Sequence, residues 1–122
     1  MPLPVLDAIE QRILGSLLEK QKTVPATYPL SLNALRLACN QTSSREPVTD
    51  LSDRELQDAA RALKDRELLR LVWAGAGSRV VKYHQRLDEA LALADDERAL
   101  VTVLLLRGAQ SAGELKTRPE RL

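Results

Sequence analysis

Aromatic, sulfur-containing and imidazole side chains are scarce in this 122-residue chain, which has no phenylalanine, one tryptophan, two tyrosines, one cysteine and one histidine. A hydrophobic core without phenylalanine has to be built from aliphatic side chains, and the abundance of leucine and alanine favours helices. A single cysteine excludes an internal disulfide. One cysteine and one histidine also cannot supply a Cys/His zinc site within one chain.

The chain lacks the motifs and segments that mark several common classes of protein. Neither the GxGxxG nor the GxxxxGK[ST] pattern occurs, so we expect no cofactor and no enzymatic activity. The longest apolar run, residues 99–106, is far shorter than the roughly 18–20 residues that span a membrane. Proline and aspartate interrupt the first seven residues, so no signal peptide is predicted and we expect a cytoplasmic protein without membrane contact.

Apolar residues at helical spacing predict three helices in the first half of the chain, each starting at a polar cap. The first spans residues 7–20 and opens with a capping box formed by Asp7 and Glu10. Ser31 caps a shorter second helix, which a polar connection follows. The second capping box and the inward face of the third helix consist of Ser52, Glu55, Leu56, Ala60 and Leu63.

The hydrophobic period changes after residue 67. Residues 68–74 and 79–84 are short β-prone runs around a four-residue connection with two glycines, which is typical of a β-hairpin. Three helices followed by a hairpin is the order of elements in a winged helix-turn-helix domain. We therefore predict a mainly α fold with a small antiparallel β-hairpin over residues 1–88.

Residues 89–122 resemble the start of a second copy of this unit. Residues 97–107 repeat the pattern of residues 10–20 at a constant offset of 87, and SAGEL at residues 111–115 is similar to SLNAL at residues 31–35. We therefore predict a tandem arrangement in which the second winged-helix domain is incomplete.

Val103 and Leu106 make the helix of this second copy apolar on more of its circumference than its counterpart, which has Ser16 and Glu19 instead. Leaving these two side chains in water would lose the free energy of burial, roughly 1.5–3 kcal/mol for each side chain. Two interpretations are open. Either this face meets a second subunit or the remainder of the domain, or it folds back on the first domain.

Several segments closely resemble the bacterial YceH-like family, in the family's own order. They are LLEKQ (17–21), TYPLSLNAL (27–35), ACNQ (38–41), SREPV (44–48), GSRVVKYHQR (77–86) and LLLRGAQSAGEL (104–115). The resemblance covers nearly the whole chain and implies two winged-helix domains in tandem, in a soluble protein that forms a homodimer. It implies no catalytic activity and carries over no functional residues. The sequence departs from the family by ending inside the second domain.

The net charge of +1 hides alternating acidic and basic segments. Residues 20–45 and 68–86 each contain four Lys or Arg residues and no acid, whereas residues 46–67 contain seven acids and four bases. The hairpin is therefore the stronger candidate for phosphate contact, through Arg79 and Lys82 near its tip. The alternative is a basic strand edge that prevents strand-to-strand aggregation.

The third helix offers a second set of candidates for nucleic-acid contact. An alternative is a solvated helix face, because Arg54 and Arg61 each have an aspartate four residues later, at ion-pair spacing. The residues that would meet phosphates and base edges are Arg54, Gln57, Arg61 and Lys64.

Other polar and aromatic residues have two interpretations each. Arg45 either contacts a phosphate or ties the turn after the second helix to a neighbouring helix, and we favour the second. Cys39 and His84 are the one thiol–imidazole combination, but we expect a buried, inert cysteine because no sequence feature supplies an oxyanion site. Trp73 and Tyr83 either offer stacking faces or seal the sheet onto the helices.

The fold type and the two basic segments together predict a non-enzymatic protein that binds double-stranded DNA as a homodimer and is associated with transcription. The alternative is a protein-interaction or dimerisation module that binds no nucleic acid. The acidic third helix and the strongly apolar later helix favour this alternative.

Overall fold

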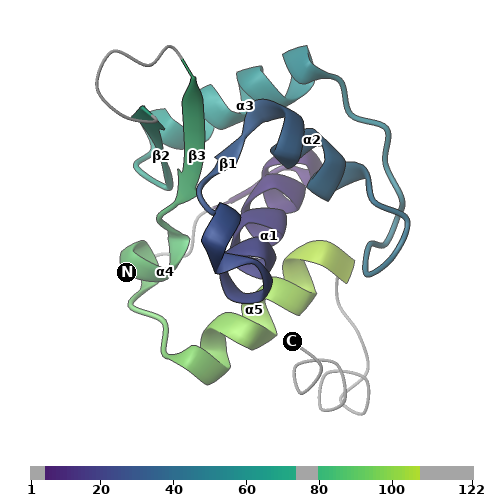
Figure 1. Cartoon of the computed structure of the whole chain (residues 1–122). Coiled ribbons are helices and arrows are strands. Elements are labelled where there is room, and N and C mark those ends of the chain that lie inside the picture. The colour runs from purple at the N-terminus through teal and green to yellow at the C-terminus, as the bar shows by residue number, and fades with distance from the viewer. Residues whose placement is uncertain (1–4, 74–79, 108–122) are drawn as a thin grey trace.

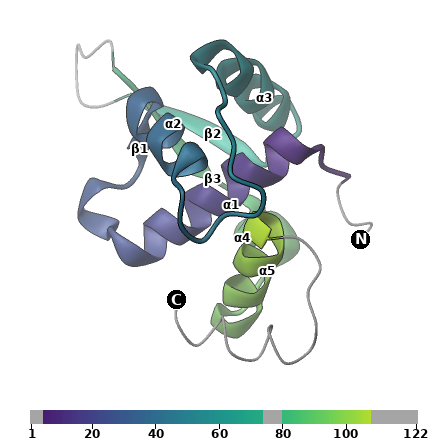
Figure 2. The ribbon, with the colours of Figure 1, turned by 90° about the vertical axis from the view of Figure 1, so that its right-hand side faces the viewer.

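The computed structural model describes residues 5–73 and 80–107, and Figures 1 and 2 show how the elements are arranged. In chain order the elements are α1 (Ala8–Thr23), the 3-10 helix η1 (Pro25–Thr27), β1 (Leu30–Ser31), α2 (Leu32–Asn40), α3 (Asp53–Asp65), β2 (Leu69–Trp73), β3 (Val81–Gln85), α4 (Leu87–Leu91) and α5 (Asp95–Arg107). Three helices followed by a hairpin is the predicted order, and the fold class is confirmed.

The helices begin where the capping residues predict. The side chains of Asp7 and Glu10 exchange hydrogen bonds with each other's backbone N–H groups at the start of α1, so the capping box is formed. Ser31 accepts from the backbone N–H of Ala34 at the start of α2. Ser52 and Glu55 form the second capping box at the start of α3. The end of α1 was predicted less well, because the helix continues to Thr23.

The hairpin is one part of a three-stranded antiparallel sheet with strand order β1-β3-β2. Leu71 lies opposite Tyr83 and Trp73 opposite Val81, which confirms the predicted pairing of the two runs. The short strand β1, which pairs Leu30 with Tyr83, was not predicted. The glycine-containing connection and Arg79 lie outside the described residues.

The core surrounds α1, which runs through the middle of the molecule between α2, α3 and α5 (Figures 1 and 2). The predicted inward face of α3 is confirmed, because Leu56, Ala60 and Leu63 are all buried. Leucines from α2 and from the start of the hairpin complete the same core. The sheet is thereby held against the three helices, and this contact sets the position of α3 relative to the hairpin.

Helix α5 packs directly on α1. A Cβ atom built at Gly15 of α1 would lie 2.8 Å from Leu106 Cδ2, so the two helices approach closely at this point. Val103 and Leu106 are 5% and 2% exposed, which leaves them little surface for a second subunit. The structure therefore favours the interpretation that this helix folds back on the first domain, while the homodimer itself stays a prediction.

Residues beyond 107, including SAGEL at 111–115, lie outside the described part of the chain, so the tandem arrangement and the division at residues 88 and 89 stay predictions. Across residues 5–73 and 80–107, no helix combines the length and the apolar character needed to cross a membrane.

Candidate nucleic-acid interface

The four residues predicted for nucleic-acid contact on α3 lie on one flank of the helix. Each is exposed, and across residues 5–73 and 80–107 none has a hydrogen-bond or ion-pair partner for its side chain. The ion pairs expected from Arg54 and Arg61 to the aspartates four residues later are not formed. The flank, which we call the basic flank, consists of Arg54, Gln57, Arg61 and Lys64.

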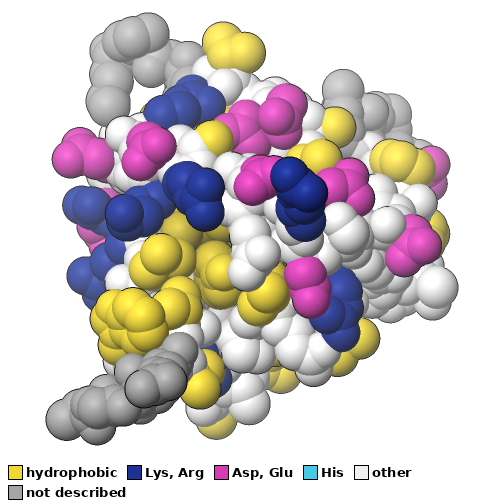
Figure 3. Space-filling view, turned by 90° about the horizontal axis from the view of Figure 1, so that it is seen from above, with side chains coloured by type: hydrophobic (Ala, Val, Ile, Leu, Met, Phe, Trp, Pro, Cys, Tyr) yellow, Lys and Arg dark blue, Asp and Glu magenta, His cyan; other side chains and the backbone are white. Residues whose placement is uncertain are grey.

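The acidic residues of α3 are spread around the helix. At 3.6 residues per turn, Asp58 and Asp65 are about 180–200° around the axis from Leu56, so they face away from the core. Asp53 is paired with Arg36 of α2, with 2.7 Å between Arg36 Nη1 and Asp53 Oδ1. Seen from above, Lys and Arg side chains form a row with acidic side chains on one side and hydrophobic side chains on the other (Figure 3). Asp58 and Asp65 thus form an outer ridge. By the same arithmetic Arg54 lies at about 160°, beside this ridge, whereas Gln57, Arg61 and Lys64 lie at about 80–140°.

An open groove of about 590 Å³ separates α3 from the hairpin. One wall is formed by Gln57, Arg61 and Lys64 of the basic flank, and the other by apolar side chains of the hairpin. Residues 31–33, at the start of α2, also line it. The lining residues of the hairpin wall are Leu71, Val80, Val81 and Tyr83. We call this feature the α3–hairpin groove.

The exposed aromatic side chain of the hairpin lies on the groove side of the sheet. Trp73 stands opposite Val81 in the strand register, and residues directly opposite in an antiparallel pair project to the same face. Val81 lines the groove. Tyr83 is buried, as expected for a residue that seals the sheet onto the helices, but Trp73 is 59% exposed. Exposure therefore leaves the stacking interpretation open for Trp73, whereas burial removes it for Tyr83.

Lys82 lies on the opposite face of the hairpin from the groove. It alternates with Val81 and Tyr83 along β3, and it stands opposite Val72. Its side chain is half-buried and has no hydrogen-bond or ion-pair partner in the described ranges. The structure thus brings three of the predicted α3 residues together in one groove and places Lys82 outside it, while Arg79 lies outside the described residues.

Arg45 is not available to a phosphate. Its side chain is buried and donates to both carboxylate oxygens of Glu19, at 2.7 and 3.1 Å, and to the backbone oxygen of Ala38. Burial of this side chain overturns its assignment as a nucleic-acid contact. The preferred interpretation, that Arg45 ties the turn to a neighbouring helix, is the correct one.

Cys39 and His84 do not form a reactive pair. Cys39 is fully buried, and burial raises the pKa of its thiol to about 11. His84 packs its ring edge-on against Tyr28, with 5.2 Å between ring centroids. Burial, with the nearby charge of Arg70, lowers the pKa of His84 below its usual value. Cys39 is therefore the inert core cysteine that the sequence predicts.

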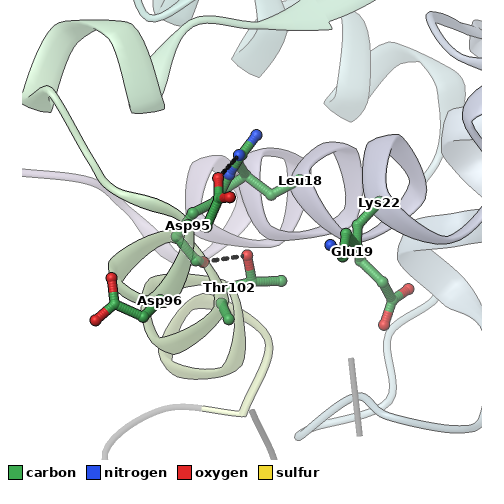
Figure 4. Close-up of a pocket in the computed structure, with 8 residues that line it drawn as sticks. Leu18, Glu19, Lys22, Asp95, Asp96 and Thr102 are labelled. Atoms are coloured by element: carbon green, nitrogen blue, oxygen red, sulfur yellow. Dashed lines mark hydrogen bonds and ion pairs between the residues drawn. The ribbon is translucent and has the colours of Figure 1, made fainter. Parts of the chain in front are cut away.

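A second cavity, of about 360 Å³, lies where α5 meets the end of α1 (Figure 4). Among its charged lining groups, Arg98 contacts Asp95 and also Asp88, which does not line the cavity. Glu19 contacts Arg45, which lies outside the cavity as well. Thr102 donates to the backbone oxygen of Arg98 within α5. The apolar circumference of this later helix indicated that it is buried, but the sequence left its partner open, so the cavity at its contact with α1 was not predicted.

Comparison with known proteins places the chain among bacterial relatives. A family profile described as "Protein of unknown function, DUF480" matches residues 6–122. A UPF0502 protein of Enterobacter sp. (strain 638) is 52% identical over 121 residues, which cover 96% of this chain and 56% of the relative. UPF0502 proteins of Dechloromonas aromatica (strain RCB) and Opitutus terrae are 50% and 49% identical, over 98% and 99% of this chain and 54% and 52% of their own lengths. The chain thus spans about half the length of these relatives.

Proposed function

The chain belongs to the DUF480 family of proteins of unknown function, and we propose that its winged-helix domain binds double-stranded DNA without catalysing a reaction. The observation that supports this proposal best is the basic flank of α3. Its three cations, Arg54, Arg61 and Lys64, have no acidic partner in the described part of the chain. Cations that are not neutralised within the protein release counterions when they meet phosphates, and this release favours binding.

The outer ridge of α3 constrains how a duplex is held. Asp58 and Asp65 face away from the core, so inserting α3 head-on into the major groove would bring carboxylates towards phosphates. A duplex lying along Gln57, Arg61 and Lys64 lies farther from these carboxylates than one that enters head-on. In this arrangement Arg54 contacts the DNA backbone from the helix, and Lys82 contacts a phosphate beyond the hairpin, from the face opposite the groove. Arg79 joins them on the strength of its sequence position.

The proposal is tested by titrating a labelled duplex with the whole chain at two salt concentrations. Binding should weaken steeply as salt rises, because each lost phosphate contact changes the slope of log affinity against log salt by about 0.9. Arg54→Ala combined with Lys82→Ala should weaken binding on all sequences alike and reduce this slope by roughly 2.

A control variant removes two cations that are already paired. Lys20→Ala with Arg86→Ala has the same change in net charge, but Lys20 lies 3.5 Å from Glu19 and Arg86 lies 3.4 Å from Glu89. This variant should change the affinity much less. Unchanged mobility of duplex DNA at low salt, or equal losses in both double variants, would overturn the proposal.

A further inference from the structure

The α3–hairpin groove adds an apolar wall to the basic flank proposed for duplex DNA. We infer that it binds a single-stranded nucleic acid, with a base stacked on Trp73 and the adjacent phosphates held by Arg61 and Lys64. This inference deepens the proposed function, because it keeps nucleic acid as the ligand and shares Arg61 and Lys64 with the basic flank. It differs in taking an unpaired strand and in adding Trp73. Arg61 and Lys64 line the groove and Trp73 lies on the groove side of the sheet, whereas Lys82 lies on the other face of the hairpin.

The two walls of the groove match the two halves of a nucleotide strand. The α3 wall is polar, with Gln57, Arg61 and Lys64, and the hairpin wall is apolar. Leu71 and Val80 on the hairpin side are among the exposed large hydrophobic residues of the chain. A single strand presents phosphates along one edge and flat apolar base faces along the other. Such strands are commonly held by a positively charged groove combined with aromatic stacking platforms.

The cations of the α3 wall are suitably placed for a strand that follows the helix. Arg61 and Lys64 are one turn apart, and Arg54 continues the row, so the basic flank is about 15 Å long at 1.5 Å per residue. This length allows contact with several consecutive phosphates.

Trp73 supplies the stacking face. Its side chain is 59% exposed on the groove side of the sheet, although indole is among the side chains that gain most from burial. A duplex keeps its base faces stacked inside the helix and cannot offer them to Trp73. An amphipathic peptide helix would need an apolar wall on both sides of the groove, and the α3 wall is polar. An unpaired strand satisfies both walls.

The experiment uses the fact that Trp73 is the single tryptophan of the chain, so all indole fluorescence comes from the proposed site. The whole chain is titrated at low salt with an oligothymidylate of about 12 nucleotides, which lies within the usual site sizes for single strands. Stacking should quench the emission in a saturable manner. Trp73→Ala should weaken binding of the labelled oligonucleotide roughly 5- to 150-fold, and Trp73→Phe should retain most of the affinity.

Leu37→Ala is the matched control, because Leu37 on α2 is 61% exposed and its truncation removes a similarly exposed apolar side chain away from the groove. It should leave oligonucleotide binding unchanged. Arg61→Ala combined with Lys64→Ala should weaken binding of the oligonucleotide. The affinity of this double variant should also fall less steeply with rising salt than the affinity of the unmodified chain. Circular dichroism of each variant confirms that the fold is retained.

The inference would be overturned if the oligonucleotide did not quench the emission, or if Trp73→Ala bound it with unchanged affinity. It would also be overturned if an acidic amphipathic peptide shifted the emission and the oligonucleotide did not. The last would assign the groove to a protein partner. If the duplex still binds and depends on Arg54 and Lys82, the proposed function stands while this inference fails. If the single strand quenches the emission but the duplex does not bind, this inference stands and the proposed function fails.

Discussion

Buried arginine side chains hold the turn between α2 and α3 in place. Arg45 and Glu19 form a two-pronged ion pair that is almost completely shielded from water. Arg12 of α1 donates to the backbone oxygens of Cys39 and Pro47 on either side of the same turn. Two guanidinium groups thus anchor the turn to α1 and α2. Replacing such a pair with apolar residues is often tolerated, but removing one partner leaves a charge buried without compensation.

We predict that Glu19→Ala lowers the free energy of unfolding by about 3–5 kcal/mol, because it leaves the buried guanidinium of Arg45 without a counter-charge. Urea denaturation followed by circular dichroism measures the loss. Glu89→Ala, which removes the exposed partner of Arg86, is the control and should cost less than about 1 kcal/mol. Similar losses in both variants would contradict this account. If Glu19→Ala does not fold, Glu19→Gln gives a smaller but measurable loss.

At the scale of elements, one glycine sets the distance between two helices. Gly15 lies in the middle of α1, where glycine costs about 1 kcal/mol relative to alanine. A Cβ at this position would lie 2.9 Å from Leu105 Cβ and 2.8 Å from Leu106 Cδ2. These separations are shorter than ordinary van der Waals contacts. The missing side chain therefore allows α5 to lie against α1.

We predict that Gly15→Ala destabilises the protein by roughly 1–3 kcal/mol, because overpacking of the α1–α5 contact outweighs the gain in helix propensity. Chemical denaturation measures the change. Leu106→Ala, which alone should cost about 2–5 kcal/mol, should reduce the penalty of Gly15→Ala when the two are combined. Strict additivity of the two changes, or a more stable Gly15→Ala variant, would show that the helices do not meet at this point.

At the scale of the whole molecule, α4 and α5 share the core of the winged-helix unit. Leu87 of α4 belongs to the same buried cluster as the leucines of α1. The backbone N–H of Glu46 donates to the backbone oxygen of Leu106 over 2.9 Å, so the turn after α2 also contacts the end of α5. The described residues after the hairpin are thus integrated with those before it.

We predict that α5 and the hairpin unfold in one cooperative transition. Trp73 emission reports on the hairpin and far-ultraviolet circular dichroism on the helices, so the two urea curves should coincide. Leu106→Asp places a carboxylate in the α1–α5 contact and should separate the curves, with loss of helical signal preceding the change in emission. Two transitions in the unmodified chain would contradict the prediction.

Much of the fold could be predicted because its signals are local. The caps at Asp7, Ser31 and Ser52 act on backbone groups three residues away, and the hairpin depends on neighbouring runs joined by a short connection. Strand β1 escaped prediction because two residues carry no periodicity and its partner is some fifty positions later in the chain. The candidate site was predicted in part: three of the four residues on the basic flank line one groove, whereas Arg45 is buried and Lys82 faces elsewhere.

Residue types and their spacing were sufficient for the order of the first three helices and the hairpin, the inward face of α3 and the positions of the positive charges. Packing between distant segments was needed to show which of those charges stay free in water and which are neutralised inside the protein. Helix periodicity places a side chain on a face, but the free energy of a charge depends on the dielectric and the partners that other elements bring to it. Arg45 and Arg61 are the same residue type in neighbouring segments, and only their long-range surroundings make one an internal anchor and the other a candidate contact for nucleic acid.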